Sequence, residues 1–194
     1  MTGVQTCALP IFTLIELMLT LSVLAILLIA AVPSFIDFFD KTRVRGAADG
    51  VISLISNARA EAVKTDLDVN IAMTGSGTSW CVGANAATPP SGGNPAGAAL
   101  PCDCTDAADV TQCRVAGQRS AVETGAYPGV QVGALPAALT FDSKLGAIAP
   151  LGTRSVTLTS PRGAYDLAVE MNALGQARLC VPTGKPSIAG VSSC

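Results

Sequence analysis

The sequence predicts an α+β protein in which one long N-terminal helix precedes a domain of short antiparallel β-strands. Three observations predict this class. The segment Phe12–Val32 is apolar throughout, apolar residues recur every three or four positions over Val44–Ala62, and from Asp66 onward apolar and polar residues alternate. We therefore expect a helix over Phe12–Lys64 whose first half spans a membrane and whose second half packs on a β-sheet domain.

The composition agrees with a membrane segment joined to one modest domain. Apolar residues make up 49% of the 194 residues and charged residues only 13%, whereas a soluble domain is nearer a quarter charged. The net charge of −2 does not indicate general nucleic-acid binding. Histidine is absent, which excludes Ser/His/Asp and Cys/His catalysis and histidine-ligated metal sites.

The first residues do not resemble the rest of the chain. Residues 2–11, TGVQTCALPI, match the conceptual translation of a common sequencing-library adaptor residue for residue. We expect residues 1–11 to be adaptor-derived sequence in place of a native leader, the alternative being a genuine but unusual leader. Leaving them out removes Cys7 from seven cysteines, and the remaining six suit disulfide pairing in an oxidising compartment.

The expected anchor, residues 12–33, contains one ionisable side chain, that of Glu16. At about 1.5 Å per residue the apolar stretch is roughly 30 Å long, the thickness of a bilayer's hydrocarbon core. A carboxylate inside lipid costs about 2.5–3.5 kcal/mol, so Glu16 either sits at the headgroup level or has a partner. A conventional signal peptide cleaved after the small residues Ala30, Ala31 and Val32 is an alternative. The long apolar stretch and the proline directly after that site disfavour it.

The string FTLIELMLTLSVLAILLIAAVPSF resembles the N-terminus of mature type IV pilins and type II secretion pseudopilins. The resemblance implies that a prepilin peptidase cuts between Ile11 and Phe12 and that the new amino group of Phe12 is N-methylated. It also implies that Glu16 neutralises the amino terminus of a neighbouring subunit in a filament and that Pro33 kinks the helix.

Two features depart from that family. The position before the cut is a glycine in the family and Ile11 here, and the short basic leader is missing. The cations after the span, Lys41, Arg43 and Arg45, would by themselves favour the opposite orientation in the membrane. Both departures follow if the native leader has been replaced.

Residues 34–65 form the amphipathic half of the expected helix. The segment RVRGAADGVISLISNARAEAVKTDLDVNIAM resembles the matching stretch of GspH/FimT-type pseudopilins, with Arg59, Glu61 and Lys64 as local matches. Any amphipathic helix under a sheet would share the periodicity, although not these particular residues. The resemblance implies a pilin-like fold.

Residues 66–194 are expected to form the β-rich domain. Strand-like runs separated by Gly, Pro, Asn and Ser occur at Asp68–Met73, Ser79–Val82, Gly129–Val132, Ala138–Asp142, Ser155–Thr159, Ala164–Met171 and Ala177–Val181. The stretches LTFDSKLGAIAPLG and VEMNALGQARLCV resemble the later strands of the same pseudopilins. Residues 84–125 lack periodicity and are expected to form a long surface insertion.

The cysteines outside the first segment are expected to form disulfides: Cys81, Cys102, Cys104, Cys113, Cys180 and Cys194. A zinc site at Cys102 and Cys104 is the alternative, but one intervening residue is tighter than the usual zinc-binding pair. We expect no metal and no cofactor. Six cysteines allow fifteen connectivities, among which we expect a Cys180–Cys194 bridge that holds the C-terminal tail.

The resemblance implies a non-enzymatic minor pseudopilin or minor pilin that initiates or caps a type II secretion pseudopilus or a type IV pilus. It implies a single-pass protein of the bacterial inner membrane with a periplasmic C-terminal domain. The implied partners are other pilins or pseudopilins, a prepilin peptidase, an inner-membrane assembly platform and membrane lipid.

Three other functions remain open. One is a DNA-uptake minor pilin, for which the tail offers only Arg178 and Lys185; two cations predict weak, salt-sensitive binding, so DNA is not expected as a partner. Another is an exported or tethered periplasmic domain of unrelated role. The third is a membrane-tethered enzyme, for which no Asp/Glu pair or Ser–Lys spacing stands out.

Overall fold

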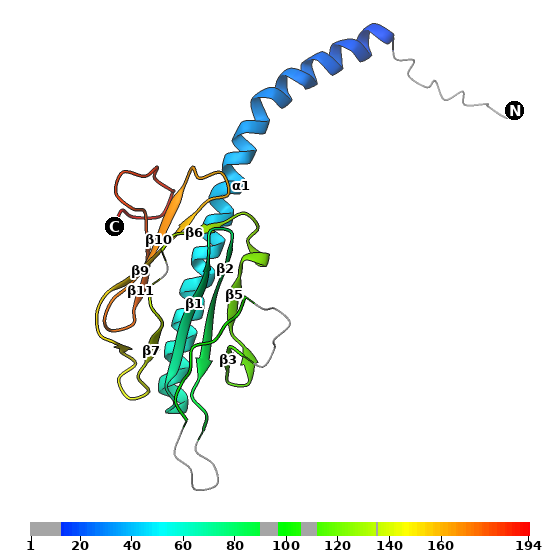
Figure 1. Cartoon of the computed structure of the whole chain (residues 1–194). Coiled ribbons are helices and arrows are strands. Elements are labelled where there is room, and N and C mark those ends of the chain that lie inside the picture. Colours follow the sequence, from blue (N-terminus) through cyan, green and yellow to red (C-terminus); the bar gives the residue numbers. More distant parts are fainter. Residues whose placement is uncertain (1–12, 90–96, 106–111, 135) are drawn as a thin grey trace, which may run out of the picture. The chain divides into compact units, whose positions relative to one another are not determined.

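The computed structural model describes residues 13–89, 97–105, 112–134 and 136–194 (Figure 1). It divides into two units, residues 1–39 and residues 40–194. Helix α1 extends over Leu14–Thr65 and contributes to both units. The described part of the first unit is the beginning of this helix, which includes Pro33 without interruption.

In the second unit, α1 is buried along one face. The buried side chains recur every three or four residues, as the amphipathic pattern predicts: Val44, Ala47, Ala48, Val51, Leu54, Ile55, Ala58 and Ala62. Half of them are alanines, so little side-chain volume separates the helix backbone from what packs against it. This face belongs to the main hydrophobic core of the domain.

The first sheet contains five strands in the order β5-β2-β1-β7-β8. Their bounds are β1 (Val69–Ser76), β2 (Ser79–Ala86), β5 (Ala121–Glu123), β7 (Leu139–Phe141) and β8 (Ile148–Ala149). β1 and β2 pair along their full length, from Val69 opposite Ala86 to Ser76 opposite Ser79. The turn that joins them contains Gly77, whose φ of 56° favours glycine.

The second sheet contains four strands in the order β11-β10-β9-β6. Their bounds are β6 (Gln131–Val132), β9 (Arg154–Thr159), β10 (Asp166–Met171) and β11 (Ala177–Cys180). A separate small hairpin joins β3 (Arg114–Val115) to β4 (Gln118–Arg119), and a 3₁₀ turn, η1, covers Thr124–Ala126. All strand pairings within the sheets are antiparallel, so the α+β class predicted from the sequence is confirmed.

Both sheets contribute to the core that covers the buried face of α1. The first sheet supplies Val69, Ile71 and Phe141, and the second supplies Leu158 and Leu167, all nearly inaccessible to solvent. Figure 1 shows strands of both sheets running beside this part of the helix. The helix therefore serves as the common support of the two sheets.

Two glycines that weaken the amphipathic helix have a packing role. A Cβ on Gly46 would lie 3.2 Å from the ring of Tyr127, and one on Gly50 would lie 2.9 Å from its hydroxyl oxygen. Tyr127 thus lies directly against the helix backbone. The loss of helix propensity, about 1 kcal/mol per glycine relative to alanine, accompanies this close contact.

The segment 84–125, expected as a surface insertion, is sheet at both ends. Its first residues complete β2, and Ala121–Glu123 form β5, which pairs with β2 opposite Cys81–Gly83. Residues 90–96 and 106–111 lie outside the described residues. The remaining segment is held by its cysteines, which form a small buried cluster of their own.

Candidate functional site

The beginning of α1 is capped by a side chain. The backbone N–H of Glu16 donates to the carbonyl oxygen of Thr13 at 3.1 Å and to its Oγ1 at 3.3 Å. This is the geometry of an N-cap, and Glu16 occupies the third position of the helix. A carboxylate in the first turn also interacts favourably with the helix dipole. Ile11 and Phe12, the expected processing site, lie outside the described residues.

The first turns of α1 expose apolar side chains. Leu14, Ile15, Leu17, Met18 and Leu19 are each more than half exposed. Further along, the hydroxyls of Thr20 and Ser22 donate to the backbone carbonyls of Leu17 and Leu19 at 2.9 and 2.8 Å, which leaves no polar group of these side chains unpaired. By length and composition the helix is apolar enough to cross a membrane.

Four of the cysteines form two neighbouring disulfides, Cys81–Cys104 and Cys102–Cys113. All four residues are buried. Cys102 and Cys104, the tight pair considered above as a zinc site, are bonded to different partners. Together the two bridges tie the described part of the 84–125 segment to β2.

The cystine cluster lies against a glycine of β2. A Cβ on Gly83 would lie 2.6 Å from Sγ of Cys102, 2.8 Å from Sγ of Cys113 and 3.1 Å from Sγ of Cys104. Any side chain at this position would displace the sulfurs. Nothing in the local sequence distinguishes Gly83 from the other glycines, so its role became visible only with the structure.

The third disulfide joins Cys180 to Cys194 and holds the C-terminal tail against β11. An ion pair supports it: Lys185 Nζ lies 2.6 Å from Oδ2 of the buried Asp166. Glu170 lies close to this disulfide, and the three side chains place their potential metal-ligand atoms within 4.8 Å of one another. Because the two sulfurs are bonded to each other, they are not thiolate ligands.

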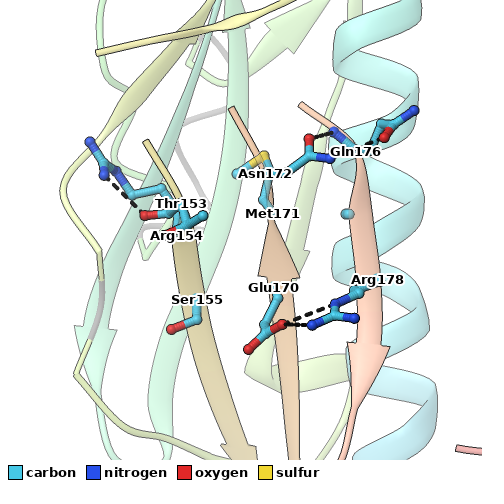
Figure 2. Close-up of a pocket in the computed structure, with 9 residues that line it drawn as sticks. Thr153, Arg154, Ser155, Glu170, Met171, Asn172, Gln176 and Arg178 are labelled. Atoms are coloured by element: carbon cyan, nitrogen blue, oxygen red, sulfur yellow. Dashed lines mark hydrogen bonds and ion pairs between the residues drawn. The ribbon is translucent and has the colours of Figure 1, made fainter. Parts of the chain in front are cut away.

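A cavity of about 500 Å³, lined by polar residues together with Met171 and Ala177, opens at the ends of β9, β10 and β11 (Figure 2). Its lining includes Thr153, Arg154, Ser155, Glu170, Asn172, Gln176 and Arg178. Arg178 donates through Nε and Nη2 to Oε2 of Glu170, at 3.0 and 2.6 Å. Asn172 Nδ2 donates to Gln176 Oε1 at 3.0 Å, and Arg154 donates to the carbonyl oxygen of Thr153.

The two cations considered for DNA contact are both paired with carboxylates. Arg178 is bound to Glu170, and Lys185 is bound to Asp166. A phosphate would have to compete with these carboxylates for each cation, which lowers the electrostatic gain of binding DNA. The arrangement therefore does not favour a DNA-binding surface at these residues.

Shifted pKa values occur at two exposed groups. Hydrogen bonds from Thr105 hold the pKa of Asp103 below its ordinary value of 3.8. The hydrogen bond from Lys144 to Asp66, together with the charge of Asp66, raises the pKa of Lys144 above 10.5. Both shifts follow from surface contacts that hold loops, and neither group lies in the cavity of Figure 2.

Comparisons with known proteins found one family and one solved structure that resemble the chain. No curated protein matches the chain in sequence. The crystal structure of the type IV minor pilin FimU of Pseudomonas aeruginosa strain PAO1 is similar, with a TM-score of 0.44 and 14% sequence identity over 74% of this chain and 91% of the FimU chain. Residues 47–175, more than half of the chain, match the family described as type II transport protein GspH. The chain therefore belongs to the GspH family.

Proposed function

We propose that this chain is a minor pseudopilin or minor pilin that enters a type II secretion pseudopilus or a type IV pilus through its N-terminal helix. The observation that carries the proposal is the apolar surface of α1 between Leu14 and Phe39, exposed in the single chain. Apolar surface of this extent is covered in its working environment, by lipid before assembly and by other subunits afterwards.

Glu16 supplies the specificity of that packing in our proposal. It is the only ionisable residue between Leu14 and Ile36, and the cap formed by Thr13 places it in the first helical turn. In an apolar bundle the carboxylate would be matched by the terminal amine of a neighbouring subunit. A mismatched register leaves a buried charge without a partner, at a cost of about 3–5 kcal/mol.

The proposed maturation follows from the same assignment. A prepilin peptidase would cut before Phe12, the new amino group would be N-methylated, and the assembly platform would extract the chain from the inner membrane. The domain of residues 40–194 would face the periplasm, a location supported by the three disulfides of its described residues. Within the filament we propose initiation or capping.

We propose a structural role and not a catalytic one. In the cavity of Figure 2, Glu170 is bound to Arg178 and the amide groups of Asn172 and Gln176 bind each other. General acid–base catalysis needs a group free to exchange a proton with a substrate. Glu170 is the carboxylate among the described lining residues, and it is already paired with Arg178.

The test is the substitution Glu16→Gln in a chain expressed behind a cleavable prepilin leader, in cells without another copy. We expect membrane insertion and the melting temperature of the domain to be unchanged, because Glu16 is exposed in the single chain. Incorporation into sheared filaments, measured by immunoblot against the membrane fraction, should fall by more than about tenfold, because each 1.4 kcal/mol lost is a factor of ten.

Asp49→Asn is the matched control. Asp49 is an exposed carboxylate on the same helix, 3.9 Å from Nε of Arg45, and exposed pairs of this kind contribute about 0–1 kcal/mol. Its incorporation should equal that of the unmodified chain. Normal incorporation of Glu16→Gln would contradict the assembly role of Glu16.

A further inference from the structure

Strand β11 forms one edge of the second sheet, with β10 as its strand partner. In an antiparallel pair, hydrogen-bonded and non-hydrogen-bonded residue pairs alternate. The N–H of Asn172 donates to the carbonyl oxygen of Gln176 at 3.1 Å, which makes Glu170–Arg178 a hydrogen-bonded pair. The backbone N–H and C=O groups of Ala177 and Leu179 therefore point away from β10.

The same alternation places the backbone of Val181 on this outer side, where it has a partner. Its N–H donates to the carbonyl oxygen of Ser192 at 2.8 Å, and its carbonyl oxygen accepts from the N–H of Cys194 at 2.9 Å. The C-terminal tail is thus a short parallel extension of the sheet at Val181. In the described part of the chain, the outward groups of Ala177 and Leu179 have no such partner.

A groove runs beside the unpaired part of this edge. It measures about 450 Å³ and is lined by Ser56, Arg59, Ala60 and Val63 of α1 and by Gly175–Ala177. The helix and the start of β11 therefore form its two walls. A groove between an edge strand and a helix is suited to an extended peptide, which adds a strand to the sheet and places alternate side chains against the helix.

The one charged residue that lines the groove is Arg59. Its Nε donates to the carbonyl oxygen of Gly146 at 2.9 Å, which fixes the guanidinium beside the groove. The two terminal nitrogens have no hydrogen bond or ion pair within the described residues. A guanidinium whose terminal nitrogens lack partners within the described residues favours a carboxylate ligand, because charge-assisted hydrogen bonds are about twice as strong as neutral ones.

We propose that this groove binds an extended segment of a partner protein that carries one acidic side chain. The segment would add to β11 through the backbone groups of Ala177 and Leu179, and its carboxylate would bind Arg59. At about 3.3 Å per residue, the free edge accepts roughly three to four residues. The inference uses only residues of the domain and does not depend on filament assembly through Glu16.

The test uses six labelled hexapeptides derived from TVTVTV, each with aspartate at a different position, and the full chain in detergent micelles. Fluorescence anisotropy should detect binding of at least one peptide to the unmodified chain. In Ala177→Pro, which removes the outward N–H but no bond to β10, affinity should fall by about tenfold. In Arg59→Gln it should fall by about fivefold or more.

Ala177→Ser, which keeps the N–H, should bind like the unmodified chain. In the complex, the amides of Ala177 and Leu179 should become protected from hydrogen exchange. Melting temperatures would identify any variant that fails to fold. If Ala177→Pro does not fold, the binding of Ala177→Ser and the hydrogen-exchange measurement test the proposal without it. The proposal is overturned if no peptide binds the unmodified chain more tightly than it binds the Ala177→Pro variant. It is also overturned if the peptide protects amides other than those of Ala177 and Leu179 from hydrogen exchange. Equal binding of the unsubstituted TVTVTV peptide would overturn the role of Arg59.

Discussion

Gly83 shows how one residue permits the cystine cluster. Three sulfurs of two disulfides lie within 3.1 Å of the position that its Cβ would occupy. Observed side-chain packing does not allow so short a distance, so the four cysteines can lie over β2 only because this residue has no side chain. The cluster then stands in place of a hydrophobic core for the segment that follows β2.

Gly83→Ala should therefore destabilise the domain by about 1–3 kcal/mol, the usual cost of overpacking. It should also slow oxidation of Cys102 and Cys113, measured as free thiols during refolding. Gly133→Ala is the control, because its Cβ would meet only Thr157, at ordinary distances of 3.8–3.9 Å. Equal melting temperatures for the two variants would contradict the proposed role of Gly83.

At the scale of the element, α1 combines two surfaces along one continuous helix. In the first unit its apolar side chains are exposed, and in the second unit its alanine-rich face is buried. The ion pair between the buried Asp40 and Arg162, 2.8 Å apart, joins the helix to the turn between β9 and β10. The second half of the helix is therefore a structural part of the domain.

Ala48→Leu tests how closely the sheets pack on α1. Ala48 is completely buried, and three additional carbon atoms there should cost about 1–3 kcal/mol of the free energy of unfolding. Asn57→Leu, on the exposed face of the same helix, should change stability by less than about 0.5 kcal/mol. Urea denaturation of both variants measures the difference, and equal midpoints would show that the helix face tolerates larger residues.

At the scale of the whole molecule, covalent bonds support a domain with short strands. Five of the strands in the two sheets contain four residues or fewer, so they contribute little cross-strand pairing: β5, β6, β7, β8 and β11. The hairpin strands β3 and β4, outside both sheets, have two residues each. The three disulfides compensate, since two hold the segment after β2 and one holds the C-terminal tail. Disulfides of this kind form and persist in oxidising environments.

Replacing Cys180 and Cys194 together by serine should lower the stability of the domain by about 3 kcal/mol, the value expected for a loop of about 15 residues. The tail would also lose its pairing with Val181, so the backbone N–H of residue 194, which donates to Val181 in the unmodified chain, should lose its protection against hydrogen exchange. Chemical denaturation gives the stability change. An unchanged midpoint would mean that the Lys185–Asp166 pair and the tail's hydrogen bonds suffice without the bridge.

Much of the fold could be predicted from local patterns. The periodicity of three or four residues located the buried face of α1, and each of the seven strand-like runs overlaps an observed strand. What local patterns missed were four strands of two or three residues, β3, β4, β5 and β8. These strands have too few residues to show an alternation, and pairing with β2 and β7 defines β5 and β8.

The sequence by itself determined the long helix, its apolar first half with the single carboxylate of Glu16, and the positions of the main strands along the chain. These depend on neighbours along the chain, through periodicity and hydropathy. Only the tertiary structure decided the partners of the other four cysteines (Cys81, Cys102, Cys104 and Cys113), the ion pairs of Arg178 and Lys185, and the unpaired edge at Ala177 and Leu179. Each of these depends on residues distant in sequence that the sheets bring together, and no local pattern encodes such a distance.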